Sequence, residues 1–261
     1  MSVAASYSLI ARNLDRSLAV TANQAPVKLE TAYYREHYGD VTSIDEFLAD
    51  SRLFRYAMTA FGLADLAYAK GYIRKILEEG VTDPDSLANR TSDQRLREFA
   101  RVFDFESYGD LTMKRVAAGE AVVDRYVRQT LETDAGSRDG DGVRLALYFA
   151  RMAPEIDNAF DILADSALSE VVRTLLGLPT AFAAVDIDRQ AEVLTERLDI
   201  ASLKDPAEVD RLLTRFTALW DAAESGASDP VLSLFGITGN TSPTISLDLA
   251  LSLNSLRLGG L

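Results

Sequence analysis

Apolar residues recur at helical spacing through most of the chain, beginning close to its N-terminus. In residues 4–22 the apolar positions fall on one side of a helix: Tyr7, Ile10, Leu14 and Leu18. This spacing predicts one amphipathic helix. The stripe is narrow, which favours docking of the helix onto the body of the protein or onto a partner. Pro26 fits the first turn of a second helix that runs towards Gly39.

One stretch of this helical pattern occurs twice. Residues 47–63 and 162–178, which are 115 positions apart, are identical at eight of 17 positions, including Leu-Ala-Asp-Ser at 48–51 and 163–166. A second pair, residues 93–104 and 210–221, matches at Asp, Leu, Phe and Asp positions with a spacing of 117, and it aligns Phe103 with Trp220. Two motifs in the same order predict a duplicated helical unit.

The repeat divides the chain into five segments. We expect N-terminal amphipathic helices in 1–42, helical repeat 1 in 43–110, connecting helices in 111–158, helical repeat 2 in 159–224, and a loop with an apolar tail in 225–261.

Local signals predict where the helices of repeat 1 begin and end. Ser43 and Glu46 have the spacing of a capping box. In this motif the serine hydroxyl accepts from the third backbone amide of the helix, and the glutamate carboxylate accepts from the amide of the capping serine. Gly62 is expected to end the following helix in the left-handed conformation. A longer helix is then expected from about residue 66 to Gly80.

Further signals cover the rest of the body. Thr91 and Gln94 resemble a weaker capping box for the helix that carries Leu96, Phe99 and Phe103. Residues 111–133 predict a helix with its apolar residues inward: Val116, Val123, Tyr126, Val127 and Leu131. Residues 134–142 are rich in glycine and charge, which predicts a surface loop. Pro154 is expected to end or kink the next helix.

The last core helix is expected to start at Asp205, with proline at its first position, and to bury four residues: Val209, Leu212, Phe216 and Trp220. No alternation of apolar and polar residues occurs in residues 1–224. The expected fold is therefore all-α and multihelical, with two pseudo-repeated halves, an amphipathic N-terminal helix and a flexible apolar C-terminal tail.

The tail has a different pattern. Residues 225–244 read as a loop. Residues 245–253 alternate as a strand would, whereas Leu249, Leu253 and Leu256 keep helical spacing, so both interpretations stay open. Such an apolar segment is expected to be buried against the body, the N-terminal helix or another molecule.

Composition limits the classes of function. The net charge of −13 is concentrated in residues 43–224, which argues against binding to nucleic acid or to an anionic membrane surface. The absence of cysteine excludes disulfides, thiolate catalysis and cysteine-bound metals. Charged residues interrupt residues 1–22, so no secretory signal is expected there, and no uncharged apolar window is long enough to span a membrane.

The candidate chemistry is sparse. His37, the only histidine, could be a base in an aromatic pocket, but a position near a helix C-terminus explains it more simply. Asp139, Asp141 and Gly142 resemble part of a calcium loop, yet Tyr148 stands where the bidentate glutamate is needed, which favours a solvated acidic loop.

The other candidate acids have structural explanations. Asp186 and Asp188 could hold Mg²⁺, but acids in the first turn of a helix suit the helix dipole. The recurring pairs Asp50-Ser51 and Asp165-Ser166 lie at helix boundaries, where they are expected to cap free amides.

No phosphate loop is expected either, because Gly71 and Gly119 each stand alone in a helix. We therefore expect no catalytic, cofactor-binding or metal-binding residues. An enzyme with carboxylates between the repeats is a third hypothesis, and it would need a deep pocket lined by acids such as Glu98, Asp161 or Glu192.

The residues resemble a known family. Residues 44–105, with Leu48-Ala-Asp-Ser51 and Phe61-Gly-Leu63, and residues 122–221, with Tyr126-Val-Arg-Gln129 and Ile162-Leu-Ala-Asp165, resemble the bacterial domain-of-unknown-function family 1217. Members occur mainly in alphaproteobacteria, and their genes often lie among flagellar genes. The family has no assigned catalytic residues, so the resemblance implies none here. Residues 1–22 are loosely similar to the N-terminal helices of flagellar rod, hook and filament proteins.

These observations favour a non-enzymatic structural or interaction protein of flagellar assembly or export. Its expected partners are proteins, flagellar components among them, and residues 1–22 and 245–261 are its expected docking elements. The protein itself is expected either in the cytoplasm or exported to the flagellum without a cleaved signal. The alternative function is a cytoplasmic chaperone or regulator that binds a partner helix between the two halves.

Overall fold

A computed structural model describes residues 1–227 of the chain. Within this range the protein consists of helices joined by turns, and no strand is present, which confirms the all-α fold. No helix in the same range is both long and apolar enough to cross a membrane. The predicted tail, residues 245–261, and most of its preceding loop lie outside the described residues.

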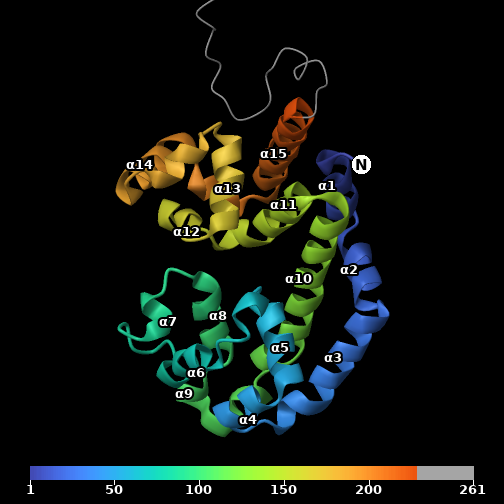
Figure 1. Ribbon diagram of the computed structural model, residues 1–261, viewed down its shortest axis with the longest axis vertical. Coiled ribbons are helices and arrows are strands. Elements are labelled where there is room, and N and C mark those ends of the chain that lie inside the picture. Colours follow the sequence, from blue (N-terminus) through green and yellow to red (C-terminus); the bar gives the residue numbers. More distant parts are fainter. Residues whose placement is uncertain (228–261) are drawn as a thin grey trace, which may run out of the picture. The chain divides into compact units, whose positions relative to one another are not determined.

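The helices follow one another closely along the chain (Figure 1). The α-helices up to residue 108 are α1 (Val3–Arg12), α2 (Leu14–Ala22), α3 (Ala25–His37), α4 (Ile44–Ala49), α5 (Ser51–Ala60), α6 (Lys70–Glu79), α7 (Leu87–Arg90), α8 (Gln94–Val102) and α9 (Phe105–Tyr108). The later ones are α10 (Glu120–Asp139), α11 (Asp141–Met152), α12 (Ala159–Leu163), α13 (Ser166–Leu175), α14 (Ile187–Arg197) and α15 (Pro206–Ala227). Short 3-10 helices connect them: η1 (Tyr38–Asp40), η2 (Ala64–Leu66), η3 (Gly109–Lys114), η4 (Val116–Ala118), η5 (Ala153–Glu155), η6 (Thr180–Ala184) and η7 (Ile200–Lys204).

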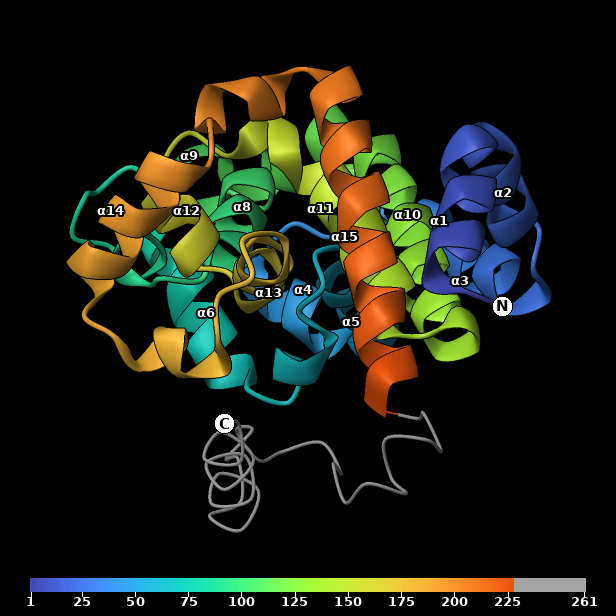
Figure 2. The same ribbon diagram turned by 90° about the horizontal axis from the view of Figure 1, so that it is seen from above.

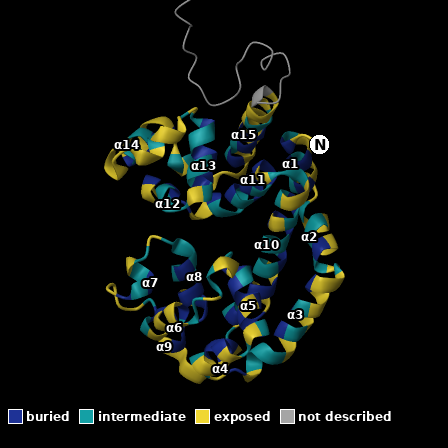
Figure 3. Cartoon of the chain, in the orientation of Figure 1, coloured by how far each residue is buried: buried dark blue, intermediate teal, exposed yellow. Residues whose placement is uncertain are grey.

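The chain forms two compact units, Met1–Leu219 and Trp220–Leu261, with the boundary inside α15. In the first unit α10 is the central helix and packs against α5, α11 and α2. The faces of α5 and α10 that meet are dark blue, that is buried, in Figure 3.

The N-terminal segment is two helices rather than the single one predicted. Asn13 leaves the helical conformation at φ −126° and ψ 38°, and its side-chain amide donates to the Leu9 carbonyl. This side-chain bond competes with the backbone ladder, which explains the break. Helix α1 packs on α11 and α2 packs on α10, as Figure 2 shows from above. The apolar face of α1, with Val3, Tyr7 and Ile10, is therefore buried against the body of the first unit.

The segment from 111 to 142 differs most from expectation. Residues 109–118 form η3 and η4 instead of a helix, and Val116 is 87% exposed rather than inward. The predicted loop at 134–142 is also wrong, because α10 continues to Asp139 and only Gly140, at φ 102°, separates it from α11. Gly136 sits where a Cβ atom would lie 2.9 Å from Cβ of Arg144. Gly136 therefore allows a close crossing of α10 and α11, and Gly140 forms the short turn between them.

One predicted helix start is confirmed and another needs correction. The Ser43 hydroxyl accepts from the Glu46 amide as expected. The Glu46 carboxylate accepts mainly from the amide and hydroxyl of Thr42 and also from the Ser43 amide, and these bonds lower its pKa. Helix α8 is capped by Asp93, whose carboxylate accepts from the Arg95 amide, and not by Thr91. Aspartate one position before the helix is a strong capping residue, which explains why it prevails.

Repeat 1 forms a continuous apolar core with an aromatic centre. Phe47 lies within 6.3 Å, between ring centroids, of four other phenylalanines: Phe54, Phe99, Phe103 and Phe105. All five are buried. The long helix predicted from residue 66 is shorter, because η2 and α6 are separate elements, and Gly80 ends α6 at φ 61°.

The first matched stretches of the two repeats have the same local structure. Gly62 and Gly177 both end a helix with positive φ, 69° and 62°, and the following leucine amide bonds back to residue 58 or 173. The packing pairs also correspond: α3 with α5, α4 with α5 and α4 with α6 in one, α11 with α13, α12 with α13 and α12 with α14 in the other. Superposition of the complete repeats stays a prediction.

The second matched stretch does not share a local structure. Asp93 caps the start of α8, whereas Asp210 lies inside α15, which starts at Pro206 and is capped by Asp205. Phe103 is buried at the end of α8, but Trp220 lies within α15 and its indole N–H donates to Glu224. In α15 it is Leu213, rather than Leu212, that is buried. The residues of this second pair therefore correspond in sequence spacing but not in structure.

Candidate functional site

Repeat 2 contains an apolar groove bounded by α12, α13, η6 and α14. Its volume is about 370 Å³. Its lining is mainly apolar and includes Leu163, Leu178, Phe182, Ala183, Ile187 and Leu194, with Ser166, Ser169, Arg173 and Gln190 between them. We call this feature the repeat 2 groove. The elements around it can be located in Figure 1.

Caps and turns hold the walls of the groove in place. Asn158 and Asp161 form a capping box at the start of α12. Asp165 caps α13 by accepting from the amides of Ala167 and Leu168, and Asp186 caps α14 in the same way. The capping predicted for Asp165 is therefore confirmed. Asp188 lies in the first turn of α14 as expected, whereas Asp186 is the capping residue of that helix.

Two residues that line the groove align with large buried residues of repeat 1. The matched stretches align Phe54 with Ser169 and Met58 with Arg173. Phe54 and Met58 are 1% and 0% exposed. Two large apolar side chains that fill repeat 1 are therefore missing from the corresponding wall of α13.

The neighbouring leucines show the effect of this difference. In repeat 1, Leu48 and Leu63 are buried. Their counterparts Leu163 and Leu178 are only half-buried and line the groove. Ile187, at the start of α14, is 54% exposed. The groove is therefore an apolar surface that repeat 2 itself leaves partly uncovered.

Two polar side chains of the groove are hydrogen-bonded to nearby backbone carbonyls. The Ser169 hydroxyl donates to the Ile162 carbonyl at 2.8 Å, and the Gln190 amide donates to the Val185 carbonyl at 2.6 Å. Arg173 differs, because its guanidinium Nη2 lies 3.8 Å from the Glu170 carboxylate, which is longer than a hydrogen bond. Arg173 is the one charged residue in the lining.

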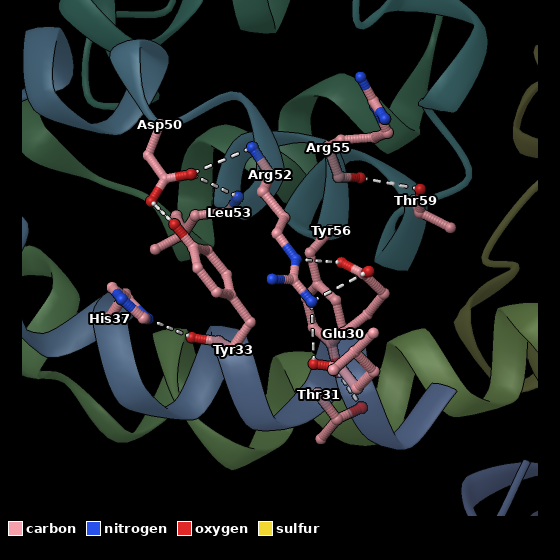
Figure 4. A network of polar contacts seen from close by, with 11 residues as sticks. Glu30, Thr31, Tyr33, His37, Asp50, Arg52, Leu53, Arg55, Tyr56 and Thr59 are labelled. Atoms are coloured by element: carbon pink, nitrogen blue, oxygen red, sulfur yellow. Dashed lines mark hydrogen bonds and ion pairs between the residues drawn. The ribbon is translucent and has the colours of Figure 1, made fainter. Parts of the chain in front are cut away.

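A second polar feature occurs in both repeats at the start of the matched helices. The Tyr33 hydroxyl donates to Asp50, and the Tyr148 hydroxyl donates to Asp165, in each case across 17 residues. Arg52 stacks over the Tyr33 ring at 4.1 Å and pairs with Glu30, as Figure 4 shows. These tyrosines were not predicted as partners of the aspartates, although each lies 17 residues before its aspartate in the sequence.

Hydrogen bonds shift the pKa values of this feature. Burial raises the pKa of Asp50, but the amides of Leu53 and Arg52 and the Tyr33 hydroxyl outweigh it and hold the pKa below its ordinary value. The bond to Asp50 raises the pKa of Tyr33. Burial first, and then the charge of Asp165, raise the pKa of Tyr148 well above its usual range. These shifts favour the charged form of Asp50 and the protonated forms of both tyrosines.

The remaining candidate residues have structural positions. His37 ends α3, stacks on Tyr33 at 4.0 Å, and its Nδ1 lies 2.8 Å from the Tyr33 carbonyl oxygen. Asp139 ends α10 and Asp141 begins α11, so the two do not form a calcium loop, and each pairs with an arginine. Gly71 lies in α6, but Gly119 precedes α10 rather than lying within a helix.

The three acids of the enzyme hypothesis do not converge. Glu98 pairs with Arg101 and Arg125. Asp161 completes the α12 capping box and accepts from Gln94, while Glu192 pairs with Arg189. In residues 1–227, no cluster of three or more His, Asp or Glu side chains is arranged to hold a metal ion.

Comparison with known proteins supports a family assignment. Residues 60–209 match the family described as protein of unknown function (DUF1217). A crystal structure of an Agrobacterium tumefaciens protein is 45% identical and covers 85% of this chain and 96% of its own, with a TM-score of 0.79. No curated protein sequence matches the chain. The chain therefore belongs to the DUF1217 family.

Proposed function

We propose that this protein is a non-enzymatic interaction protein of flagellar assembly or export, and that the repeat 2 groove binds an apolar segment of a protein partner. The observation that carries the proposal is the contrast between the repeats. Repeat 1 buries Phe54 and Met58 at the positions where repeat 2 has Ser169 and Arg173.

The exposure of apolar side chains around the groove supports this proposal. Ile187 is 54% exposed and Val185 is 40% exposed. Contiguous apolar surface in contact with water is unfavourable, and where it gathers around a hollow it commonly marks a binding site. A helix or extended segment that covers the groove would bury these side chains.

The bonding of the acidic residues supports a role without catalysis. A general acid or base needs a carboxyl group that can reach a substrate. Glu98, Asp161 and Glu192 are engaged in ion pairs or caps, and Asp50 and Asp165 hold helix amides. These carboxylates therefore act as structural partners.

The flagellar part of the proposal depends on the resemblance and on gene context. The structure limits how residues 1–22 could serve as a docking element, because Val3, Tyr7 and Ile10 are buried. Leu9 and Val20, which are 61% and 60% exposed, remain accessible for contacts with other molecules.

The proposal is tested by filling the groove as repeat 1 is filled. We expect the double variant Ser169→Phe/Arg173→Met, in place of the native gene, to reduce swimming and the export of flagellar proteins while the protein is still produced and folded. Arg189→Met, on an exposed side chain of α14, is the matched control and should leave both unchanged. Normal swimming and export in the double variant would contradict the proposal.

A second candidate is a cytoplasmic chaperone or regulator that binds a helix of an exported protein. The buried face of α1 favours it, because a helix already packed on α11 is poorly suited to polymerisation through that face. Fractionation of cells and medium distinguishes the candidates. A chaperone remains in the cells, whereas an exported component is found in the medium or on the flagellum.

A further inference from the structure

We infer that the repeat 2 groove recognises an aromatic side chain with a carboxylate next to it, carried by a segment of a partner protein. This inference rests on the proposed function and specifies the chemistry of the partner. Two independent observations carry it: the small residue Ser169 at the position where repeat 1 has Phe54, and the charge of Arg173.

The first observation is the residue that aligns with Ser169 in repeat 1. This residue, Phe54, is buried and packs edge-to-face against Phe47, with ring centroids 5.7 Å apart. In repeat 2 the aligned residue is Ser169, and Phe182 of η6 lines the hollow. Aromatic rings favour edge or offset contacts with other rings. A phenyl ring from a partner therefore fits the volume and can pack against Phe182.

The second observation is the charge of the groove wall. Arg173 replaces a fully buried methionine, and its side chain is 25% exposed. It forms an ion pair with Glu170 at 3.8 Å, which is longer than a hydrogen bond. Ser169 and Gln190 are bonded to carbonyls of the groove, so Arg173 is the lining residue best placed to meet a ligand charge. A guanidinium group binds a carboxylate with two parallel hydrogen bonds.

The inference is tested by NMR titration of the full-length protein with three capped dipeptides: acetyl-Phe-Glu-amide, acetyl-Phe-Gln-amide and acetyl-Ala-Glu-amide. The methyl signals of Leu163, Leu178, Ile187 and Leu194 report on the groove. We expect Phe-Glu to bind at least about threefold more tightly than either control, as a partly exposed ion pair allows.

Two variants separate the contribution of the ligand's carboxylate from that of its aromatic ring. Arg173→Gln should remove the difference between Phe-Glu and Phe-Gln and leave the difference between Phe-Glu and Ala-Glu. Ser169→Phe should abolish the shifts at the groove. Unfolding curves of both variants show whether the fold is retained.

The outcomes distinguish this inference from the proposed function. Equal affinity for Phe-Glu and Phe-Gln, with shifts at the groove, overturns the carboxylate preference and leaves a general apolar binding site. The absence of groove shifts with any dipeptide counts against both. Shifts that arise only after Phe235→Ala would identify the chain's own residues 228–261 as the occupant and overturn the inference of a separate partner.

Discussion

Tyr148 donates a 2.5 Å hydrogen bond to the carboxylate of Asp165, which itself caps α13. Tyr33 and Asp50 form the same arrangement at 2.8 Å before α5. In each case one carboxylate oxygen holds two helix amides and the other accepts from the tyrosine. The bond therefore ties α11 to the start of α13 in repeat 2, and α3 to the start of α5 in repeat 1.

Removing the tyrosine hydroxyl should destabilise the protein. Tyr148→Phe leaves a carboxylate oxygen without its donor, and we expect a loss of about 1.5 kcal/mol in the free energy of unfolding. Tyr33→Phe should have a smaller effect because its surroundings are more exposed. Tyr68→Phe is the control, since Tyr68 is 85% exposed. Denaturant unfolding measures all three, and an unchanged midpoint for Tyr148→Phe would contradict the structural role of the bond.

The Asp50 cap predicts a particular dependence of stability on pH. Because the pKa of Asp50 is lowered in the folded protein from its ordinary value of 3.8, its contribution is fully present above that value and is lost as the pH falls through the folded pKa. Asp50→Asn should therefore destabilise the protein at neutral pH, and the difference from the native protein should shrink below pH 3.8. A difference that stays constant between pH 7 and the acid limit would refute this reading.

Glu132 should be among the most sensitive charged residues. Its side chain is 1% exposed and pairs with both Arg128 and Arg151. Glu132→Gln would leave two arginines without their shared acid, and we expect a loss of about 3 kcal/mol in unfolding free energy. The exposed pair of Glu208 and Arg211 gives the control, because Glu208→Gln should change stability by less than about 0.5 kcal/mol. Similar losses in both variants would contradict the burial argument.

Two helical glycines should respond in opposite ways to alanine. At Gly136 the new Cβ atom would lie 2.9 Å from Cβ of Arg144, so α10 and α11 must move apart. At Gly71 nothing lies within 4 Å, and alanine should stabilise α6 by up to about 1 kcal/mol through its helix propensity. We expect Gly136→Ala to lower the melting temperature and Gly71→Ala to raise it. A rise in both would show that the crossing of α10 and α11 is not tight.

The sequence predicted the elements whose signals are local. Asp50, Asp165 and Asp205 are caps, and Gly62 and Gly80 have positive φ, because capping and chain reversal depend on a few adjacent residues. The all-α fold follows from the helical period, which the hydrophobic positions display directly.

The features that the sequence did not predict depend on tertiary contacts. The glycines at 136, 140 and 142 suggested a loop, but Gly136 lies inside α10 and allows Arg144 to approach, which only the packing of α11 reveals. The break at Asn13 depends on one side-chain bond to the Leu9 carbonyl. The groove could have been predicted from the differences between the repeats, because the matched stretches align Ser169 with Phe54. The prediction used only the positions at which the two stretches are identical.

The central claim is that the repeat 2 groove is kept open for binding and is not required for folding. The most direct measurement is the unfolding free energy of Ser169→Phe/Arg173→Met, compared with the swimming of cells that carry it. We predict stability equal to or greater than that of the native protein, because the new side chains fill an apolar hollow, together with impaired swimming. A stable variant that supports normal swimming would contradict the claim.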